Sequence, residues 1–396
     1  MRVLQINVVY KSGSTGKIVA SLHNYLLQKG IESFVLYGRG FSSNDSNTIK
    51  ICSNLFARWH KLSSFFLGNM YGGNSLSTRK AIRAIKKINP DVIHLHCLNG
   101  DFVNIYKLLS WIRTNNISTI MTLHAEFMFT GNCSHSFECE QWKKGCADCP
   151  RPFRSSRRPF KATVSRAWNK MRKAFDGFEK LSVVSVSPWL MARAEESSIL
   201  AKFKHYYIGN GVDCSLFHRY SQSKLENKQI VLHVSPNFDN NINNIKGGVF
   251  FAELAKTYID TDIEFWVVGN YKKSQHYPKN IKFLGRIDDQ KELARVYSEA
   301  SVTVLTSKRE TFSLVAAESL CCGTPVIGFK AGAPETIAID AYSKFVTYGD
   351  LKELKQCLDL FLTKSFEREE ISRDAIELYS SEKMCSSYLE LYKRNQ

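Results

Sequence analysis

Two glutamates eight positions apart, Glu310 and Glu318, mark the stretch of the sequence best suited to chemistry. A strand is expected to end a few residues before Glu310, and a helix to begin near Ser313. The first turn of a helix offers unpaired amide groups and the positive end of the helix dipole, and both favour phosphate. One carboxylate could then reach a sugar hydroxyl and the other a ribose, because a carboxylate accepts two hydroxyl groups at once. The same glutamates could instead be a surface residue and a helix cap or salt-bridge partner.

Four other residues lie at the end of a predicted strand or after one and could add to such a site. Lys246 comes after the strand expected over residues 230–235, where its charge could neutralise a diphosphate, or it could be a solvated surface lysine. His124 closes the strand expected over residues 119–124, where an imidazole could donate to a developing charge or a sugar hydroxyl; a structural histidine is the alternative. Gly13 and Gly16 would let the backbone approach a phosphate or sugar closely. Their spacing is not that of a Walker A loop, and a tight turn without a ligand is the alternative.

These considerations give two sets of candidate residues. The predicted catalytic residues are His124, Lys246 and Glu310. The predicted donor-binding residues are Gly13, Gly16, Lys246, Thr311, Phe312, Ser313, Leu314 and Glu318.

Four cysteines lie within residues 130–150, namely Cys133, Cys139, Cys146 and Cys149. Four thiolates could satisfy a tetrahedral structural zinc, although the first pair does not have the usual spacing. Reduced thiols packed in a loop and a redox-active pair are the alternatives. We expect no catalytic metal here.

Residues 151–173 are basic, with nine lysines and arginines and no acidic residue: Arg151, Arg154, Arg157, Arg158, Lys161, Arg166, Lys170, Arg172 and Lys173. Aromatic residues are interleaved with them, namely Phe153, Phe160, Trp168 and, just beyond, Phe175. A basic, aromatic segment can lie on an anionic membrane. A solvated helix face and nucleic-acid binding are the alternatives.

A larger framework must hold these residues. The chain has 396 residues, enough for two or three domains, and its 44% hydrophobic content is that of a globular protein. Short apolar runs alternate with amphipathic stretches in both halves, which predicts two parallel sheets covered by helices. Ligands bind such sheets beyond the carboxyl ends of the strands. The net charge of +17 favours polyanions such as nucleic acid, anionic membrane or phosphorylated substrates.

Targeting signals are not evident in the sequence. Gln5 and Asn7 interrupt the first apolar stretch, unlike the apolar core of a signal peptide. No apolar run approaches the ~20 residues of a spanning helix. We therefore expect a protein of a reducing cytoplasm, in which most of the 11 cysteines are thiols or metal ligands.

The region around the two glutamates resembles family 4 of the retaining nucleotide-sugar glycosyltransferases. That family has Glu-x7-Glu followed by a helix end of the type Cys-Gly-Thr-Pro-Val, as in residues 310–326 here, and then a Gly-rich turn ending in Pro-Glu, as in residues 331–335. Residues 210–213, Asn-Gly-Val-Asp, are similar to the family's hinge motif. The resemblance covers most of the chain in the right order.

The resemblance implies an α/β protein of the GT-B fold, with two doubly wound Rossmann-like domains facing across a cleft. Residues 1–208 would form the acceptor-side domain, with the cysteine-rich insertion 130–150 and the basic segment 151–173. Residues 209–378 would form the nucleotide-sugar-binding domain. Residues 379–396 would form a helix that packs back on the first domain.

Two departures from the family pattern affect the candidate site. Relatives have His-Asp where His124 is followed here by Ala125 and Glu126. Relatives also pair the lysine with an arginine soon after the strand, and none lies between Ser235 and Lys246. Asn237, Arg286 or Lys308 could replace the missing group.

The implied function is that of a retaining hexosyltransferase that needs neither cofactor nor divalent cation, since no Asp-x-Asp site is evident. Its donor would be a nucleoside-diphosphate sugar. The cysteine-rich segment resembles a subgroup concerned with colanic acid, capsule and O-antigen synthesis. This subgroup implies an acceptor oligosaccharide linked to polyprenyl diphosphate and a peripheral location on the inner face of the cell membrane. A basic zinc-containing nucleic-acid-binding protein and another GT-B enzyme, such as a sugar-nucleotide epimerase or phosphorylase, are the alternatives.

Overall fold

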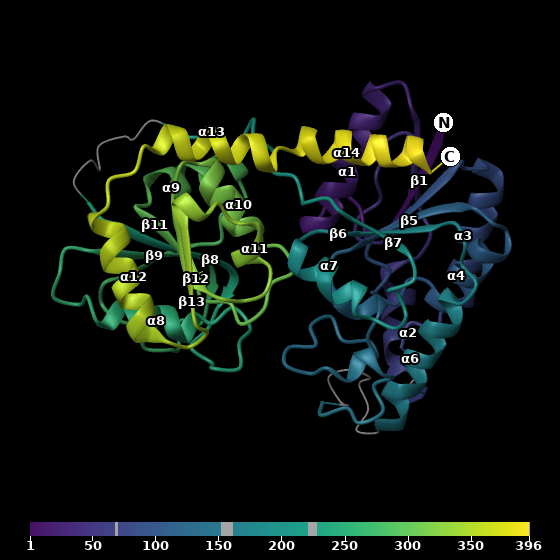
Figure 1. The fold of residues 1–396 in the computed structure, drawn as a ribbon, viewed down its shortest axis with the longest axis horizontal. Coiled ribbons are helices and arrows are strands. Elements are labelled where there is room, and N and C mark those ends of the chain that lie inside the picture. Colours follow the sequence, from purple (N-terminus) through teal and green to yellow (C-terminus); the bar gives the residue numbers. More distant parts are fainter. Residues whose placement is uncertain (68–69, 152–160, 221–227, 396) are drawn as a thin grey trace. The chain divides into compact units, whose positions relative to one another are not determined.

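The chain forms two compact units in the computed structural model, which describes residues 1–67, 70–151, 161–220 and 228–395 (Figure 1). Unit 1 comprises Met1–Gly209 and Cys385–Gln396, and unit 2 comprises Asn210–Met384. The chain passes from unit 1 to unit 2 within the turn-prone residues 208–213. It returns inside helix α14 (Ser381–Arg394).

Unit 1 is built on a parallel sheet of seven strands in the order β3-β2-β1-β4-β5-β6-β7. The strands are β1 (Arg2–Val9), β2 (Glu32–Arg39), β3 (Thr48–Lys50), β4 (Val92–Leu95), β5 (Ser118–Leu123), β6 (Leu181–Ser185) and β7 (Lys204–Tyr207). The helices are α1 (Gly13–Gln28), α2 (Asn54–Leu67), α3 (Ser75–Ile88), α4 (Ile105–Thr114), α6 (Lys161–Phe175) and α7 (Pro188–Glu195), with short turns η1 (Glu126–Met128) and η2 (Gln141–Lys143). Central strands such as β4 and β6 are buried along their whole length, as expected of parallel strands covered on both faces.

Unit 2 repeats this plan with six parallel strands in the order β10-β9-β8-β11-β12-β13. The strands are β8 (Ile230–Phe238), β9 (Glu264–Tyr271), β10 (Ile281–Gly285), β11 (Val302–Leu305), β12 (Val326–Phe329) and β13 (Ser343–Val346). The helices are α8 (Gly248–Lys256), α9 (Gln290–Glu299), α10 (Leu314–Cys321), α11 (Pro334–Ile337), α12 (Leu351–Thr363) and α13 (Arg368–Tyr379), with the turn η3 (Asp340–Tyr342). The prediction of two parallel α/β domains is confirmed.

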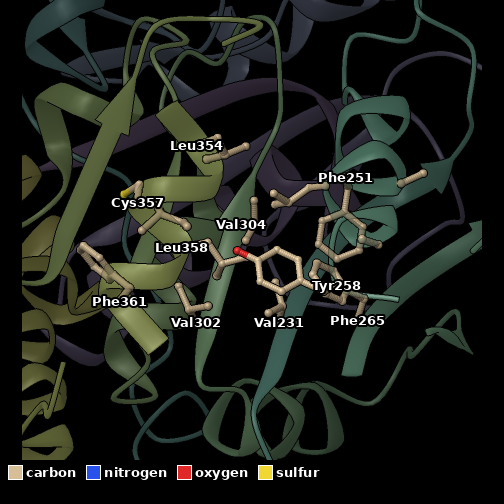
Figure 2. Packing of buried hydrophobic residues seen from close by; sticks show 14 of the residues in the cluster. Val231, Phe251, Tyr258, Phe265, Val302, Val304, Leu354, Cys357, Leu358 and Phe361 are labelled. Atoms are coloured by element: carbon tan, nitrogen blue, oxygen red, sulfur yellow. The ribbon is translucent and has the colours of Figure 1, made fainter. Parts of the chain in front are cut away.

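The core of unit 2 lies between its sheet and helices α8 and α12. Figure 2 shows Phe251 from α8 and Leu358 from α12 pointing toward Val231 and Val304 of the central strands. These side chains are almost fully buried. Burying a large apolar side chain contributes roughly 1.5–3 kcal/mol, so this layer fixes the positions of the strands and of the loops that follow them.

Candidate functional site

The strand order of unit 2 reverses between β8 and β11, which are neighbours in the sheet. In an open parallel sheet the loops at such a switch point diverge and leave room for a ligand. The loop after β8 carries Lys246, and the loop after β11 carries Glu310. Lys246 Nζ lies 2.6 Å from Glu310 Oε1, with 32% of the lysine side chain and 18% of the glutamate side chain exposed. The two residues predicted separately from sequence therefore meet, and both stay accessible.

The backbone of the Lys246 loop is held against the end of β11. Thr306 Oγ1 donates to the carbonyl oxygen of Lys246 at 3.1 Å, and the amide of Lys308 donates to the carbonyl of Ile245 at 2.8 Å. Gly247 has a φ of +65°, and a Cβ there would lie 2.0 Å from the carbonyl oxygen of Thr306. Only glycine fits so close an approach without movement of the backbone.

A second loop, after β12, fixes the backbone of Glu310. Its amide donates to the carbonyl of Ala331 at 3.0 Å, and its carbonyl accepts from Ala333 at 3.3 Å. Glu335 in turn accepts hydrogen bonds from the amides of Ala331 and Gly332, at 3.0 and 2.9 Å. Glu335 thus orients the loop on which Glu310 depends, a role that its place in a Gly-rich turn did not indicate.

Helix α10 begins at Leu314, one residue after the expected start. The backbone of its N-cap residue, Ser313, is in the left-handed region, with a φ of 89°. The Ser313 Oγ accepts a hydrogen bond from the amide of Ala316 at 3.4 Å. A non-glycine residue in this region stores on the order of 1–3 kcal/mol of strain, which is common at functional sites. Phe312 is buried and its ring contacts that of Tyr379, so only its backbone can face a ligand. Thr311 and Leu314 are partly exposed.

Glu318 lies inside α10 and is oriented by a buried tyrosine. Tyr297 OH donates to Glu318 Oε2 at 3.1 Å. Burial and the neighbouring carboxylate raise the pKa of Tyr297 well above its ordinary value, so this hydroxyl remains protonated and donating. Tyr297 lies on α9, and nothing in its local sequence indicated this role.

The groups considered as substitutes for the missing arginine have other contacts. Arg286 is largely exposed and pairs with Asp288 at 2.7 Å. The Lys308 ammonium lies 5.8 Å from the centre of the Tyr348 ring. Asn237 is exposed in β8. Lys246 is therefore the cation that the structure places beside Glu310.

In unit 1, His124 directly follows β5 and contacts a chain of buried polar groups. His124 Nε2 lies 3.3 Å from His96 Nδ1, and His96 Nε2 lies 3.2 Å from Gln5 Oε1. Because Gln5 Nε2 donates to the carbonyl of Val19, its Oε1 is oriented to accept from His96 Nε2. His96 Nδ1 then accepts a hydrogen bond from the N–H of His124 Nε2. This assignment follows from the hydrogen-bond network.

Burial determines the charge of His124. Burial lowers the pKa of His124 to about 4, so the ring is neutral at neutral pH. Burial and neighbouring histidines also lower the pKa of His96 and of His94. His94 contacts the hydroxyl groups of Tyr392 and Thr122 at 2.6 and 2.7 Å. His124 can therefore act through hydrogen bonds and not as a fixed positive charge.

The glycines predicted to line a loop after β1 lie inside a helix instead. Helix α1 begins at Gly13, so Gly13 and Gly16 are in its first turn and the loop is shorter than expected. Gly16 is buried, and its carbonyl accepts from the amide of Lys11 at 3.0 Å. Gly13 has a φ of +63° and nothing crowds its Cβ position.

Glu126, two residues after His124, is fully buried and paired with Arg193 at 2.6 Å. Ser136 completes the cluster, since its amide and hydroxyl donate to Glu126 at 2.6 and 2.9 Å. Arg193 also lies over the ring of Trp142. Glu126 therefore anchors the cysteine-rich segment to unit 1 and does not take the position of a group facing a substrate.

The four cysteines lie near one another, since the other three act electrostatically on Cys146. Among the residues that the structure describes, which include Cys133, Cys139, Cys146 and Cys149, no three His, Cys, Asp or Glu side chains could together hold a metal ion. None of the 11 cysteines, all in the described ranges, forms a disulfide. Burial chiefly, and the neighbouring Cys133, Cys139 and Cys149, raise the pKa of Cys146 to about 12. Zinc binding stays a prediction, which metal analysis of the purified protein would test.

The described part of the basic segment is amphipathic as expected, but its apolar face packs into unit 1. Arg154, Arg157, Arg158, Phe153 and Phe160 lie outside the described residues. In the described part, Arg166, Arg172 and Lys173 are exposed, but Trp168 and Phe175 are buried in the core of unit 1. The indole of Trp168 donates to the carbonyl of Trp142 at 2.9 Å. The expectation that these two aromatic rings contribute to a membrane-binding face is therefore wrong.

Two cavities lie away from the candidate residues. One, of about 530 Å³, is lined in unit 1 by Ser118, Lys180 and Lys204, at the amino ends of β5, β6 and β7. The other, of about 700 Å³, is lined in unit 2 by Lys228 and Glu264, at the amino ends of β8 and β9. Open parallel sheets bind ligands at the opposite edge, so the loops bearing Lys246 and Glu310 are the better candidate site.

Comparisons with known proteins agree with this architecture. The family described as Glycosyltransferase Family 4 matches residues 15–216, and Glycosyl transferases group 1 matches residues 229–364. WcaC of Escherichia coli K12, provisionally described as a colanic acid biosynthesis glycosyl transferase, is 23% identical over 421 residues, covering 99% of this chain and 100% of WcaC.

Solved structures share the fold. Sucrose-phosphate synthase from Thermosynechococcus elongatus aligns with a TM-score of 0.66 at 18% identity, covering 99% of this chain and 98% of that one. The Anabaena protein HepE, solved in complex with UDP, aligns with a TM-score of 0.64 at 16% identity, covering all of both chains. The first family match spans about half of the chain, and the second covers most of unit 2. With two parallel α/β units of the GT-B fold and these matches, the chain belongs to glycosyltransferase family 4 and is a glycosyltransferase.

Proposed function

We propose that this enzyme transfers a sugar from a nucleoside-diphosphate sugar to a lipid-linked oligosaccharide during synthesis of a surface polysaccharide. The observation that carries the proposal is the 2.6 Å contact of Lys246 with Glu310 at the switch point of unit 2, close in sequence to the start of α10. A cation, a carboxylate and a helix N-terminus together suit a sugar diphosphate, whose phosphates and hydroxyls need opposite partners. HepE, which shares the fold, was solved with UDP and with UDP-glucose.

Each residue has a distinct role in this proposal. Lys246 and the amides from Thr311 to Leu314 stabilise the charge on the departing diphosphate. Glu310 accepts hydroxyl hydrogen bonds and orients the sugar, and Glu318, held by Tyr297, binds the ribose. When the diphosphate binds Lys246, the ammonium no longer needs Glu310 as its partner, so the carboxylate becomes available to the sugar. His124 contributes a neutral hydrogen-bonding group.

The reaction we propose retains the configuration at the anomeric carbon. The bond from this carbon to the diphosphate oxygen breaks, and the acceptor hydroxyl oxygen forms its bond on the same face. The departing phosphate oxygen receives the hydroxyl proton. No protein nucleophile is needed, so the protein supplies position and charge stabilisation.

Sugar transfer with a panel of nucleotide sugars and a polyprenyl-diphosphate-linked acceptor tests this function. We expect Lys246→Met and Glu310→Gln each to reduce turnover by about 100-fold or more, as loss of a charge-stabilising group does. Lys228→Met is a matched control, because Lys228 pairs with Glu264 at 2.5 Å at the opposite edge of the same sheet. Full turnover by the Lys246 and Glu310 variants, or a product of inverted configuration by NMR, would contradict the proposal. Activity in EDTA tests the expected independence from divalent cations.

A further inference from the structure

In the part of helix α2 whose side chains the structure describes, three large apolar residues lie on the outside. Leu55 and Trp59 are each 70% exposed, and Leu62 is 51% exposed. Their spacing of four and three residues places them on one face of the helix. Ala57, on another face, is only 2% exposed. Surface helices ordinarily turn their apolar stripe toward the core, so the stripe of Leu55, Trp59 and Leu62 has the reverse arrangement.

Other exposed apolar side chains lie next to α2. Phe41 is 95% exposed, and the amide of the preceding Gly40 donates to the side chain of Asn54, the first residue of α2, at 3.0 Å. Five of the ten large exposed hydrophobic residues in the described chain lie between positions 41 and 76. Exposed apolar residues that gather on a surface, as Phe41 does beside the stripe on α2, indicate an interaction site.

The surrounding charge is almost entirely positive. Residues 39–87 contain nine lysines and arginines and a single acidic residue, Asp45. Asp45 is already engaged by Lys11 and by the hydroxyl of Tyr10. Arg58 and Lys61, on α2 itself, are exposed. Within the described part of the chain neither of them forms an ion pair.

We propose that α2 docks unit 1 on an anionic lipid bilayer. The docking surface, called here the α2 surface, consists of Phe41, Leu55, Arg58, Trp59, Lys61 and Leu62. Apolar and indole side chains enter the boundary between headgroups and acyl chains, while arginine and lysine meet the negative lipid headgroups. A protein partner fits less well, because the cores of protein interfaces are depleted of lysine. None of the helices in the described ranges has the length and apolar character needed to cross a bilayer.

The position of α2 suits the proposed acceptor. This inference rests on the proposed function, in which the acceptor is attached to a lipid. Phe41 follows β2, and α2 follows β3, so both begin at the carboxyl edge of the parallel sheet. His124 follows β5 at the same edge. A bilayer at the α2 surface would hold the lipid of the acceptor on the side of unit 1 where His124 lies.

Vesicle flotation tests the α2 surface directly. The probes are vesicles of phosphatidylcholine alone and of phosphatidylcholine and phosphatidylglycerol in equal parts. We expect the full chain to float with the anionic vesicles only. The triple variant Leu55→Ser, Trp59→Ser, Leu62→Ser should weaken binding by more than about 100-fold. The double variant Arg58→Gln, Lys61→Gln should weaken vesicle binding about 30-fold, because each basic residue near an anionic surface contributes about 1 kcal/mol, or slightly more than about fivefold in affinity.

Matched controls come from exposed residues of unit 2. Leu360→Ser with Leu378→Ser removes exposed apolar side chains, and Lys291→Gln with Lys352→Gln removes exposed charges. Neither should change flotation. As a second measurement, brominated lipid should quench the part of the tryptophan emission that the Trp59→Phe variant lacks.

Three results would overturn the inference. The triple variant could float like the wild type, neutral vesicles could bind as tightly as anionic ones, or the triple variant could change the oligomeric state with no vesicle binding by any form. Nucleotide-dependent stabilisation of all variants serves as the folding check. If vesicles bind through α2 but no lipid-linked acceptor is glycosylated, the proposed function fails and the docking stands. If transfer occurs without vesicle binding, the docking alone fails.

Discussion

Replacing Gly247 by alanine should disable the site without touching a reacting group. The added Cβ would lie 2.0 Å from the carbonyl oxygen of Thr306, so the loop that carries Lys246 must move. The left-handed backbone, with φ +65°, adds about 1–2 kcal/mol for an L-residue. Overpacking adds about 1–3 kcal/mol. We therefore expect a loss of about 2–5 kcal/mol in the free energy of unfolding of unit 2, together with weaker nucleotide binding.

Gly285→Ala is the matched control for this prediction. Gly285 has a similar φ of +74°, but nothing lies within 4 Å of its Cβ position. It should lose only the backbone contribution of about 1–2 kcal/mol and keep nucleotide affinity. Urea unfolding and calorimetric titration with nucleoside diphosphates measure both quantities. Equal stability and equal affinity of the two variants would refute the claim that close contact with Thr306 positions Lys246.

Three further predictions concern the groups around the candidate residues. Tyr297→Phe removes the hydrogen-bond donor to Glu318. It should weaken nucleotide binding, measured by calorimetry, about tenfold or more, because a hydrogen bond to a charged group contributes about 1.5–3 kcal/mol. Unchanged affinity would contradict the role of Glu318. Burial in the fold lowers the pKa of His124 from 6.5 to about 4. The stability that the neutral ring contributes is therefore fully present above pH 6.5 and is lost as the pH falls toward 4. The urea midpoint of the wild type should fall across this window, and the midpoint of His124→Gln should fall by a smaller amount. Glu126→Gln breaks a buried ion pair with Arg193 and should lower the free energy of unfolding by about 3–5 kcal/mol in urea titrations, whereas the exposed Glu253→Gln should have little effect.

The strands were predictable because most of them are buried parallel strands with nearly continuous apolar runs. The predicted strand over residues 230–235 corresponds to β8, and that over 119–124 to β5, with shifted ends. The edge strands β3 and β7 were missed because Thr48–Lys50 and Lys204–Tyr207 are short and carry lysine among mixed side chains. The sequence did not indicate helix α2, because Leu55, Trp59 and Leu62 are exposed and do not mark a core face.

The candidate site was predictable only in part. Glu310 and Lys246 each stood out because they follow strands, but their contact depends on β8 and β11 being neighbours, which the order of the sheet decides. Tyr297, His96 and Gln5 act through partners distant in sequence, and nothing in their local sequence indicated these partners. The burial of Trp168 and Phe175 depends on packing of α6, which a basic segment with interleaved aromatic residues does not reveal.

Calorimetric titration of UDP, GDP and dTDP into three proteins tests the central claim most directly. We predict that the wild type and Lys228→Met bind the same nucleotide with equal affinity. Lys246→Met should bind it at least about 10-fold more weakly, because a buried or partly buried charge-assisted contact is lost. Equal affinity in Lys246→Met would show that the diphosphate does not lie at the switch point between β8 and β11.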